Sequence, residues 1–356
     1  MKLLLRFLLL FLCAEKQKIY SEVVLDYSKC QKFFYKSAPP KIGFLNQPEL
    51  DLAGICQKLG NVYHFATLYS KYWRIPMYSA YELQDPQNWR PGPSGEIVVT
   101  KECTSVQKSR GTWFIEPQLS GGNRPDNMAT ALGESDIFKI NQAIEVDYSN
   151  TGFDRGHLNP ASYNCDLDRE ATFTLTNAVP QNPCFNEQTW KILEQTARTA
   201  MRKLCNFPGA KRYFVTGTVP QNRMIPNKEH DAESDRIRQF NRVSVPSHLW
   251  TAACCDSSQA SDPTKRANGF SIAYYGENKA YSSPKSSNVP DLEGWLTRQY
   301  TEIKNIKIFA DDCFKDSANS IIATGMLEKV IGIQGKNAES SASSMKPSTL
   351  PPKKRP

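Results

Sequence analysis

The chain has 356 residues, of which 40% are hydrophobic and 11% aromatic, enough for one large globular domain or two small ones. Its formal net charge is +8, but residues 1–14 contribute two of these charges and residues 336–356 a net four, which leaves +2 for the body. This near balance excludes bulk charge as the source of any affinity for nucleic acid, so phosphate binding must come from a local cluster. Because no internal repeat favours two domains, we expect one.

The first residues, MKLLLRFLLLFLCA, combine Lys2 and Arg6 with a short apolar run that ends at the small residues Cys13 and Ala14. The run is too short to span a bilayer. We therefore expect a signal peptide at residues 1–21, cut between residues 14 and 21, and a secreted or lumenal protein without stable membrane insertion. A buried core segment is the alternative.

The ten cysteines are too many for a reduced cytosolic enzyme, and no pair has the C-x-x-C spacing of a zinc site. This composition predicts disulfides. Removal of Cys13 with the signal peptide leaves nine, so one cysteine should be free or should link two chains as a disulfide-bonded dimer.

The chain beyond the signal peptide mixes strand and helix patterns. Residues 22–60 read as an irregular segment pinned by a disulfide, while 84–95 and 118–127 read as loops. Strands are predicted at 62–69, 73–82, 112–117, 171–176, 212–219, 243–253 and 270–275, and helices at 187–204 and 292–300. Regular βαβ units are absent, so we expect an α+β domain over 22–315 with a mainly antiparallel central sheet flanked by helices. Residues 316–356 are predicted to be a disordered basic tail.

The segment Asp154-Arg155-Gly156-His157 places an acid, a cation and a base within four residues. The chain has three other histidines. His64 and His248 lie in strand patterns and read as core or edge residues, and His230 lies in an exposed polar run. His157 is therefore the strongest candidate for a general base. The alternative is a loop ion pair between Asp154 and Arg155 beside a packed histidine.

A second polar stretch begins shortly after this segment with Thr176-Asn177 and Pro180-Gln181. It continues as a row spaced by four residues on the predicted helix, namely Asn186, Trp190, Glu194 and Arg198. Such a row turns slowly around a helix, by roughly 40° per step. Taken singly, Asn186 could cap the helix, and Glu194 could pair with Arg198.

With both stretches at this spacing, the sequence resembles the DNA/RNA non-specific endonucleases of the ββα-metal class, which include endonuclease G and secreted bacterial nucleases. The resemblance covers about residues 62–309. The signal-like start, the cysteines and residues 245–250 are most similar to the endonuclease domain-containing 1 branch of that family.

The resemblance implies that His157 activates water and that Asn186 is the protein ligand of Mg²⁺, with Mn²⁺ as an alternative ion. Glu194 would hold the water shell of the metal, Arg155 and Arg198 would face the substrate phosphate or the metal shell, and Asp154 and Asn177 would complete the catalytic group. Mg²⁺ keeps most of its waters, so few protein ligands suffice.

The implied function is the hydrolysis of DNA and RNA with little sequence preference, since phosphate contacts carry little sequence information. Two other functions remain open: a catalytically silent secreted module that binds nucleic acid or protein, and a hydrolase of other phosphodiesters or nucleotides. Further candidates for phosphate contacts are Arg110, Arg124 and Arg242.

Overall fold

The computed structural model describes residues 23–24, 26–43, 48–84, 89–91, 97–99, 113–121, 124–130, 136–228, 239–300 and 305–344. The expected signal peptide, Arg110, His230 and the last twelve residues, 345–356, lie outside the described residues.

An antiparallel sheet of eight strands forms the centre of the molecule and confirms the expected α+β class. In their order across the sheet, the strands are β1 (Val23–Val24), β3 (Leu52–Leu59), β4 (Val62–Ser70), β5 (Ile75–Glu82), β12 (Lys211–Val219), β15 (His248–Asp256), β16 (Phe270–Glu277) and β17 (Lys285–Ser287). The middle strands are buried almost throughout, because further layers cover both faces of the sheet.

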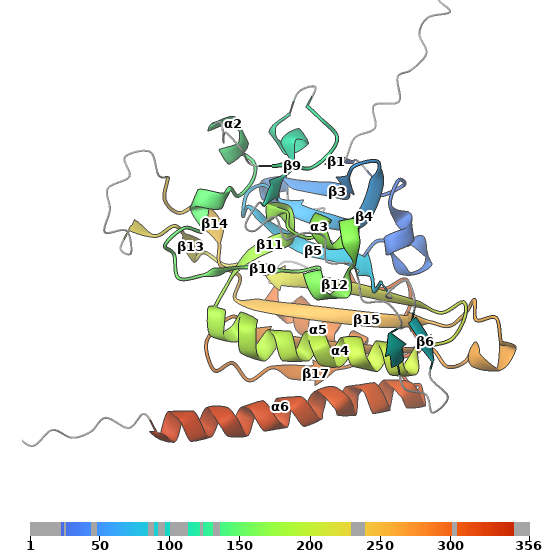
Figure 1. The fold of residues 1–356 in the computed structure, drawn as a ribbon. Helices are drawn as coiled ribbons and strands as arrows, with labels where there is room; N and C mark the ends of the chain where they lie inside the picture. Colours follow the sequence, from blue (N-terminus) through green and yellow to red (C-terminus); the bar gives the residue numbers. More distant parts are fainter. Residues whose placement is uncertain are drawn as a thin grey trace, which may run out of the picture.

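Alternate residues of the strands enter two different cores. Phe214 of β12 lies in the first core, whereas its neighbours Tyr213 and Val215 lie in the second. The first core is covered by α4 (Lys191–Leu204) and α6 (Ala318–Ser344), which lie side by side in Figure 1. The second core is covered by α5 (Val289–Gln299).

The remaining elements are short. Paired strands outside the main sheet are β2 (Lys41–Ile42) with β18 (Ile306–Lys307), β6 (Trp89–Pro91) with β7 (Ile97–Val99), β8 (Phe114–Ile115) with β9 (Ala129–Thr130), β10 (Asp154–His157) with β11 (Ala178–Gln181), and β13 (Met224–Ile225) with β14 (Val243–Ser244). The short helices and turns are η1 (Gln31–Phe33), η2 (Tyr35–Ser37), η4 (Pro48–Leu50), η5 (Pro117–Ser120), α2 (Asp136–Lys139), η6 (Glu145–Asp147), η7 (Ala161–Tyr163), α3 (Asp166–Ala171), η8 (Leu175–Asn177), η9 (Phe185–Trp190) and η11 (Pro263–Lys265).

The strand predicted at 171–176 is wrong. The segment ends α3, forms one bridge from Thr174 to Phe114, and enters η8. Its alternation comes from threonines whose hydroxyls bond other groups, as Thr172 does with the carbonyl of Arg169 and Thr174 with Glu116.

Two further predicted segments differ from the structure. Residues 22–60 contain strand β3, which sequence reasoning read as irregular. Residues 243–253 are two strands, β14 and β15, because Pro246 lies between them and cannot donate to a ladder.

The prediction of a disordered tail from residue 316 is wrong for Ala318–Ser344, which forms α6. Ala323 and Leu327 are fully buried in the first core, and α6 packs along α4. A few small and medium apolar residues at helical spacing suffice here because α4 provides the surface that they cover. Among the described residues, no helix is both long and apolar enough to cross a lipid bilayer.

The structure contains the predicted disulfides. Cys30 bonds to Cys56, Cys205 to Cys255 and Cys254 to Cys313, and Cys165 is also disulfide-bonded. The bond at Cys30 pins the N-terminal segment to β3, as the sequence suggested. Within the described part of the chain, the free cysteine is Cys184, which is exposed.

Candidate active site

The two sequence stretches meet in a small ββα unit. Strand β10 carries Asp154 to His157 and pairs with β11 in antiparallel register, with Asp154 opposite Gln181 and His157 opposite Ala178. The chain then passes from β11 into the π-helical turn η9 and on into α4. The order strand, strand, helix is thus continuous through the site, apart from the excursion between His157 and Ala178.

Asp154 and Asn186 are in direct contact. The Nδ2 atom of Asn186 donates a hydrogen bond of 2.9 Å to Oδ2 of Asp154. This bond fixes the orientation of the amide, whose Oδ1 accepts no hydrogen bond from the described residues and remains able to bind a cation. Asp154 therefore positions Asn186.

His157 lies between two aromatic rings. Its ring centroid is 5.0 Å from that of Trp113 and 4.8 Å from that of Phe173. Burial, with the positive charges of Arg169 and Arg155, lowers the pKa of His157 to about 4. The imidazole is therefore neutral at physiological pH, which is the state that accepts a proton.

The two ring nitrogens of His157 have different surroundings. Nε2 is buried without a hydrogen-bond partner among the described residues. Nδ1 has no such partner either, but it is not among the buried unpaired atoms, so water can reach it. A lone pair on Nδ1, with the proton on Nε2, is the arrangement that suits a base.

Arg155 is half-buried beside His157. Its Nη1 donates a hydrogen bond of 2.6 Å to Oε1 of Glu145, and its guanidinium carbon lies 5.0 Å from the centre of the Trp113 ring. These two contacts hold the cation next to the histidine, where it can also face an anion.

Asn177 is fully buried and serves the surrounding loops. Its Nδ2 donates to the carbonyls of Asn159 and Thr172, and its Oδ1 accepts from the amide of Asn159 and the hydroxyl of Ser79. With its amide fully used, Asn177 positions the chain that follows His157 and has no donor left for a substrate.

Glu194 and Arg198 lie one turn apart on α4. Burial is the largest influence on the Glu194 carboxyl and raises its pKa to about 8, although the adjacent Trp190 side chain opposes the shift. The backbone carbonyl of Glu194 accepts a hydrogen bond of 2.6 Å from the Tyr163 hydroxyl. A buried carboxyl of this kind gains from a nearby cation, which favours its ionised form.

Gln181 is a residue of the second stretch to which the sequence analysis gave no role. It is fully buried, and neither atom of its side-chain amide has a hydrogen-bond partner among the described residues. The amide covers Gly156, where an added Cβ would lie 2.7 Å from Cβ of Gln181. The Pro180-Gln181 pair was the signal that the sequence offered for this residue. The position of Gln181 opposite Asp154 depends on strand register, which the sequence did not reveal.

Trp113, Phe173 and Glu145 were also missed. They touch His157 or Arg155 but come from segments separated from them by 10 to 44 residues, with no motif of their own.

His64 and His248 are placed as predicted. His64 is buried and bonds Asp168 at 2.5 Å, and His248 packs on Trp295 at 5.2 Å between ring centroids, away from His157.

Among the described residues, no group of three or more His, Cys, Asp or Glu side chains could enclose a metal ion. The oxygen donors that the site residues offer are the free amide oxygen of Asn186 and the carboxyls of Asp154 and Glu194. This set fits a hydrated Mg²⁺, which is bound through few protein oxygens, and does not fit zinc, which takes three or four nitrogen or sulfur ligands.

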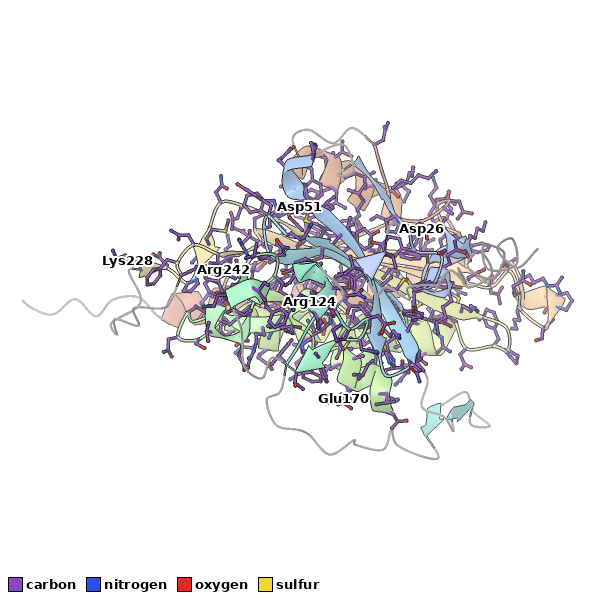
Figure 2. All side chains as sticks on the ribbon, turned by 90° about the horizontal axis from the view of Figure 1, so that it is seen from above. Asp26, Asp51, Arg124, Glu170, Lys228 and Arg242 are labelled. Atoms are coloured by element: carbon purple, nitrogen blue, oxygen red, sulfur yellow. A yellow bond between two sulfur atoms is a disulfide. The ribbon has the colours of Figure 1, made fainter. Side chains whose placement is uncertain are left out.

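Arg242 is not available for phosphate. Its guanidinium is buried and forms a pair with Asp147 at 2.7 Å, so the prediction that it contacts substrate is wrong. Figure 2 shows Arg242 inward of Lys228, which lies at one end of the molecule. Arg124 donates to the carbonyl of Gly121 and lies over the Phe138 ring.

Comparison with known proteins gives the same assignment as the motifs. The human endonuclease domain-containing 1 protein is 32% identical over 244 residues, which is 67% of this chain but 41% of that protein. Bovine mitochondrial endonuclease G is 30% identical over 157 residues, covering 42% of this chain and 49% of the relative. Nuclease C1 of Cunninghamella echinulata is 30% identical over 147 residues, covering 39% and 54%.

This chain thus spans less than half the length of its human relative. The family model for DNA/RNA non-specific endonucleases matches residues 49–307, a range that contains both site stretches and the whole ββα unit. The chain belongs to the DNA/RNA non-specific endonuclease family.

Proposed function

We propose that this protein is a secreted, Mg²⁺-dependent endonuclease that hydrolyses phosphodiester bonds of DNA and RNA with little sequence preference. The observation that supports this most directly is that His157, which has a water-accessible nitrogen, lies on the same strand as the Asp154 that orients Asn186. The lowered pKa of His157 agrees with a role as base. General base and metal-binding amide are thereby held by one rigid unit.

In this proposal His157 takes the proton of the attacking water at Nδ1. Arg155, held by Glu145 and Trp113, faces the phosphate together with Arg198. Asn186 and Glu194 would hold Mg²⁺, which when bound stabilises negative charge on the phosphate and on the leaving oxygen. Asp154 and Asn177 act by positioning, the first through Asn186 and the second through the loop after His157.

Secretion is part of the proposal. Disulfides persist in oxidising compartments and are rare in the cytosol. Three disulfides with both partners described, together with the signal-like start, support export from the cell.

The decisive experiment is plasmid relaxation by the purified protein with Mg²⁺, with EDTA, and by two variants. We expect EDTA to abolish nicking without unfolding the domain. His157→Ala should lower kcat by roughly 10²- to 10⁴-fold, the worth of a positioned acid or base. Asn186→Ala should reproduce the effect of EDTA.

His248→Ala is the matched control, because it removes a half-buried histidine that packs on Trp295 away from the site. It should cleave like the parent. Undiminished cleavage in EDTA or by His157→Ala would contradict the mechanism. Binding of DNA without cleavage would identify a silent binding module, and turnover of nucleotides alone would identify a hydrolase of small phosphodiesters.

A further inference from the structure

A pocket of about 260 Å³ opens beside the end of the ββα unit that carries Asp154. It is formed where three segments meet: residues 150–153 before β10, Asn182 after β11, and residues 223–227 around β13. Since Asp154 pairs with Gln181, Phe153 and Asn182 directly extend the two strands that build the site. The pocket is therefore lined by residues that adjoin the candidate active site along both strands.

The pocket presents hydrogen-bond donors without described partners. Asn182 uses its Oδ1 to accept from the amide of Phe185, which leaves Nδ2 free. The side chain of Asn150 forms no hydrogen bond with the described residues. The Arg223 guanidinium forms no ion pair with them and lies 5.2 Å from the centre of the Phe153 ring.

The one charged side chain that lines the pocket is positive. No carboxylate is among the lining residues, and Arg223 is the charged one. Lys228 directly follows the lining residue Asn227 and lies at one end of the molecule in Figure 2. A pocket lined by hydrogen-bond donors and a cation, without a carboxylate, fits a ligand that is anionic and rich in acceptor oxygens.

The distance to the base suits a neighbouring unit of a polymer. Phe153 precedes His157 by four residues along an extended strand, about 13 Å at 3.3 Å per residue. The volume is below the roughly 300–1,000 Å³ of pockets for drug-sized ligands, so it suits a single unit of a chain.

We propose that this pocket is a substrate subsite that takes one nucleotide adjacent to the scissile bond, with its phosphate on Arg223 and its sugar or base oxygens on Asn150 and Asn182. The proposal rests on the proposed nuclease function. Stacking of the guanidinium on Phe153 holds the Arg223 fork in place for the phosphate, and its exposed side leaves room for an unpaired base.

The test measures binding apart from cleavage. The probe is a short fluorescein-labelled oligothymidylate, titrated with the full chain carrying His157→Ala, at several salt concentrations with Mg²⁺. Adding Arg223→Gln should weaken binding roughly tenfold at low salt, and the log-log salt slope should fall by about 0.7, the value for one single-strand phosphate. Asn150→Gly should weaken binding by less and leave the slope unchanged, because the amide is neutral.

Glycine is the chosen replacement at position 150 because Asn150 has φ of 54°, which glycine adopts freely. Arg298→Gln is the matched control, since it removes an exposed arginine from α5 on the opposite layer. It should bind like the His157→Ala parent. Thermal unfolding checks that each variant is folded, and Arg223→Lys, which keeps the charge, should keep the salt slope.

Equal affinity and slope for the parent and Arg223→Gln would overturn the subsite, as would a parent that does not bind the probe. Binding that depends on Arg223 in a protein that never cleaves would leave the subsite standing and refute the nuclease proposal. Cleavage by the native chain with binding independent of Arg223 would support the nuclease proposal and refute the subsite.

Discussion

At the residue scale, the aromatic enclosure of His157 predicts an unusual pH dependence. A general base must be unprotonated, and burial lowers the pKa of His157 to about 4. At saturating Mg²⁺, which favours the ionised form of the Glu194 carboxyl, kcat/KM should stay level down to about pH 5 and fall below that, whereas an ordinary imidazole would lose half of its base form at about pH 6.5.

Arg169→Gln provides the comparison for this profile. The charge of Arg169 helps to lower the pKa of His157, and the residue is exposed on α3, so its removal should move the acid limb to higher pH. The measurement is kcat/KM against pH for both proteins. An acid limb near pH 6.5 in the parent would show that burial does not control this base.

A substitution at Gly156 should destabilise the fold. A Cβ at this position would overlap the Gln181 side chain, so Gly156→Ala must displace a buried amide inside the ββα unit. We expect a loss of about 1–3 kcal/mol in the free energy of unfolding, as for other overpacked sites. Gly325→Ala in α6 has open space around its Cβ and should stabilise the protein by about 0.5–1 kcal/mol. Urea unfolding measures both, and a fully stable Gly156→Ala would mean that Gln181 moves freely.

At the element scale, α6 supports the helix that carries Glu194 and Arg198. Leu327 of α6 is fully buried in the first core, so Leu327→Ala should lower the free energy of unfolding by about 2–5 kcal/mol. Ile321 on the same helix is 72% exposed, and Ile321→Ala should change stability by no more than about 0.5 kcal/mol. Similar, small effects in both variants by thermal or urea unfolding would restore the prediction of a loose C-terminal segment.

At the scale of the whole molecule, disulfides join the layers. The Cys205–Cys255 bond connects the end of α4 to β15, and Cys254–Cys313 connects β15 to the segment before α6. Replacing both Cys205 and Cys255 with alanine should lower the free energy of unfolding by about 2–5 kcal/mol, as removal of native disulfides does. Urea unfolding measures this loss.

The free thiol gives a further test of the whole chain. Thiol labelling of the purified protein under denaturing, non-reducing conditions should modify one cysteine, and Cys184→Ser should abolish the labelling. A disulfide-linked dimer, seen on a non-reducing gel, would also consume this thiol. Two or more labelled thiols in fresh protein would contradict the disulfide framework.

The sequence by itself determined the family, several strands of the main sheet, the helix that carries Glu194, and the need for disulfides. These features are local. Asp154 to His157 are consecutive residues of one strand, and Glu194 and Arg198 follow the repeat of α4, so spacing along the chain sufficed to reveal these groups. The π-helical turn that carries Asn186 departs from the α-helical row that the sequence predicted.

Only the tertiary structure decided what surrounds these groups. Trp113 and Phe173 pack on His157 from other segments of the chain, and burial of the His157 ring is the largest cause of its lowered pKa. Gln181 meets Gly156 through strand register. Residues 318–344 became a helix because α4 offers a surface to cover, which their own weak apolar pattern does not record. Burial and pairing depend on the partner that a residue meets after folding, and sequence spacing carries no information about partners far along the chain.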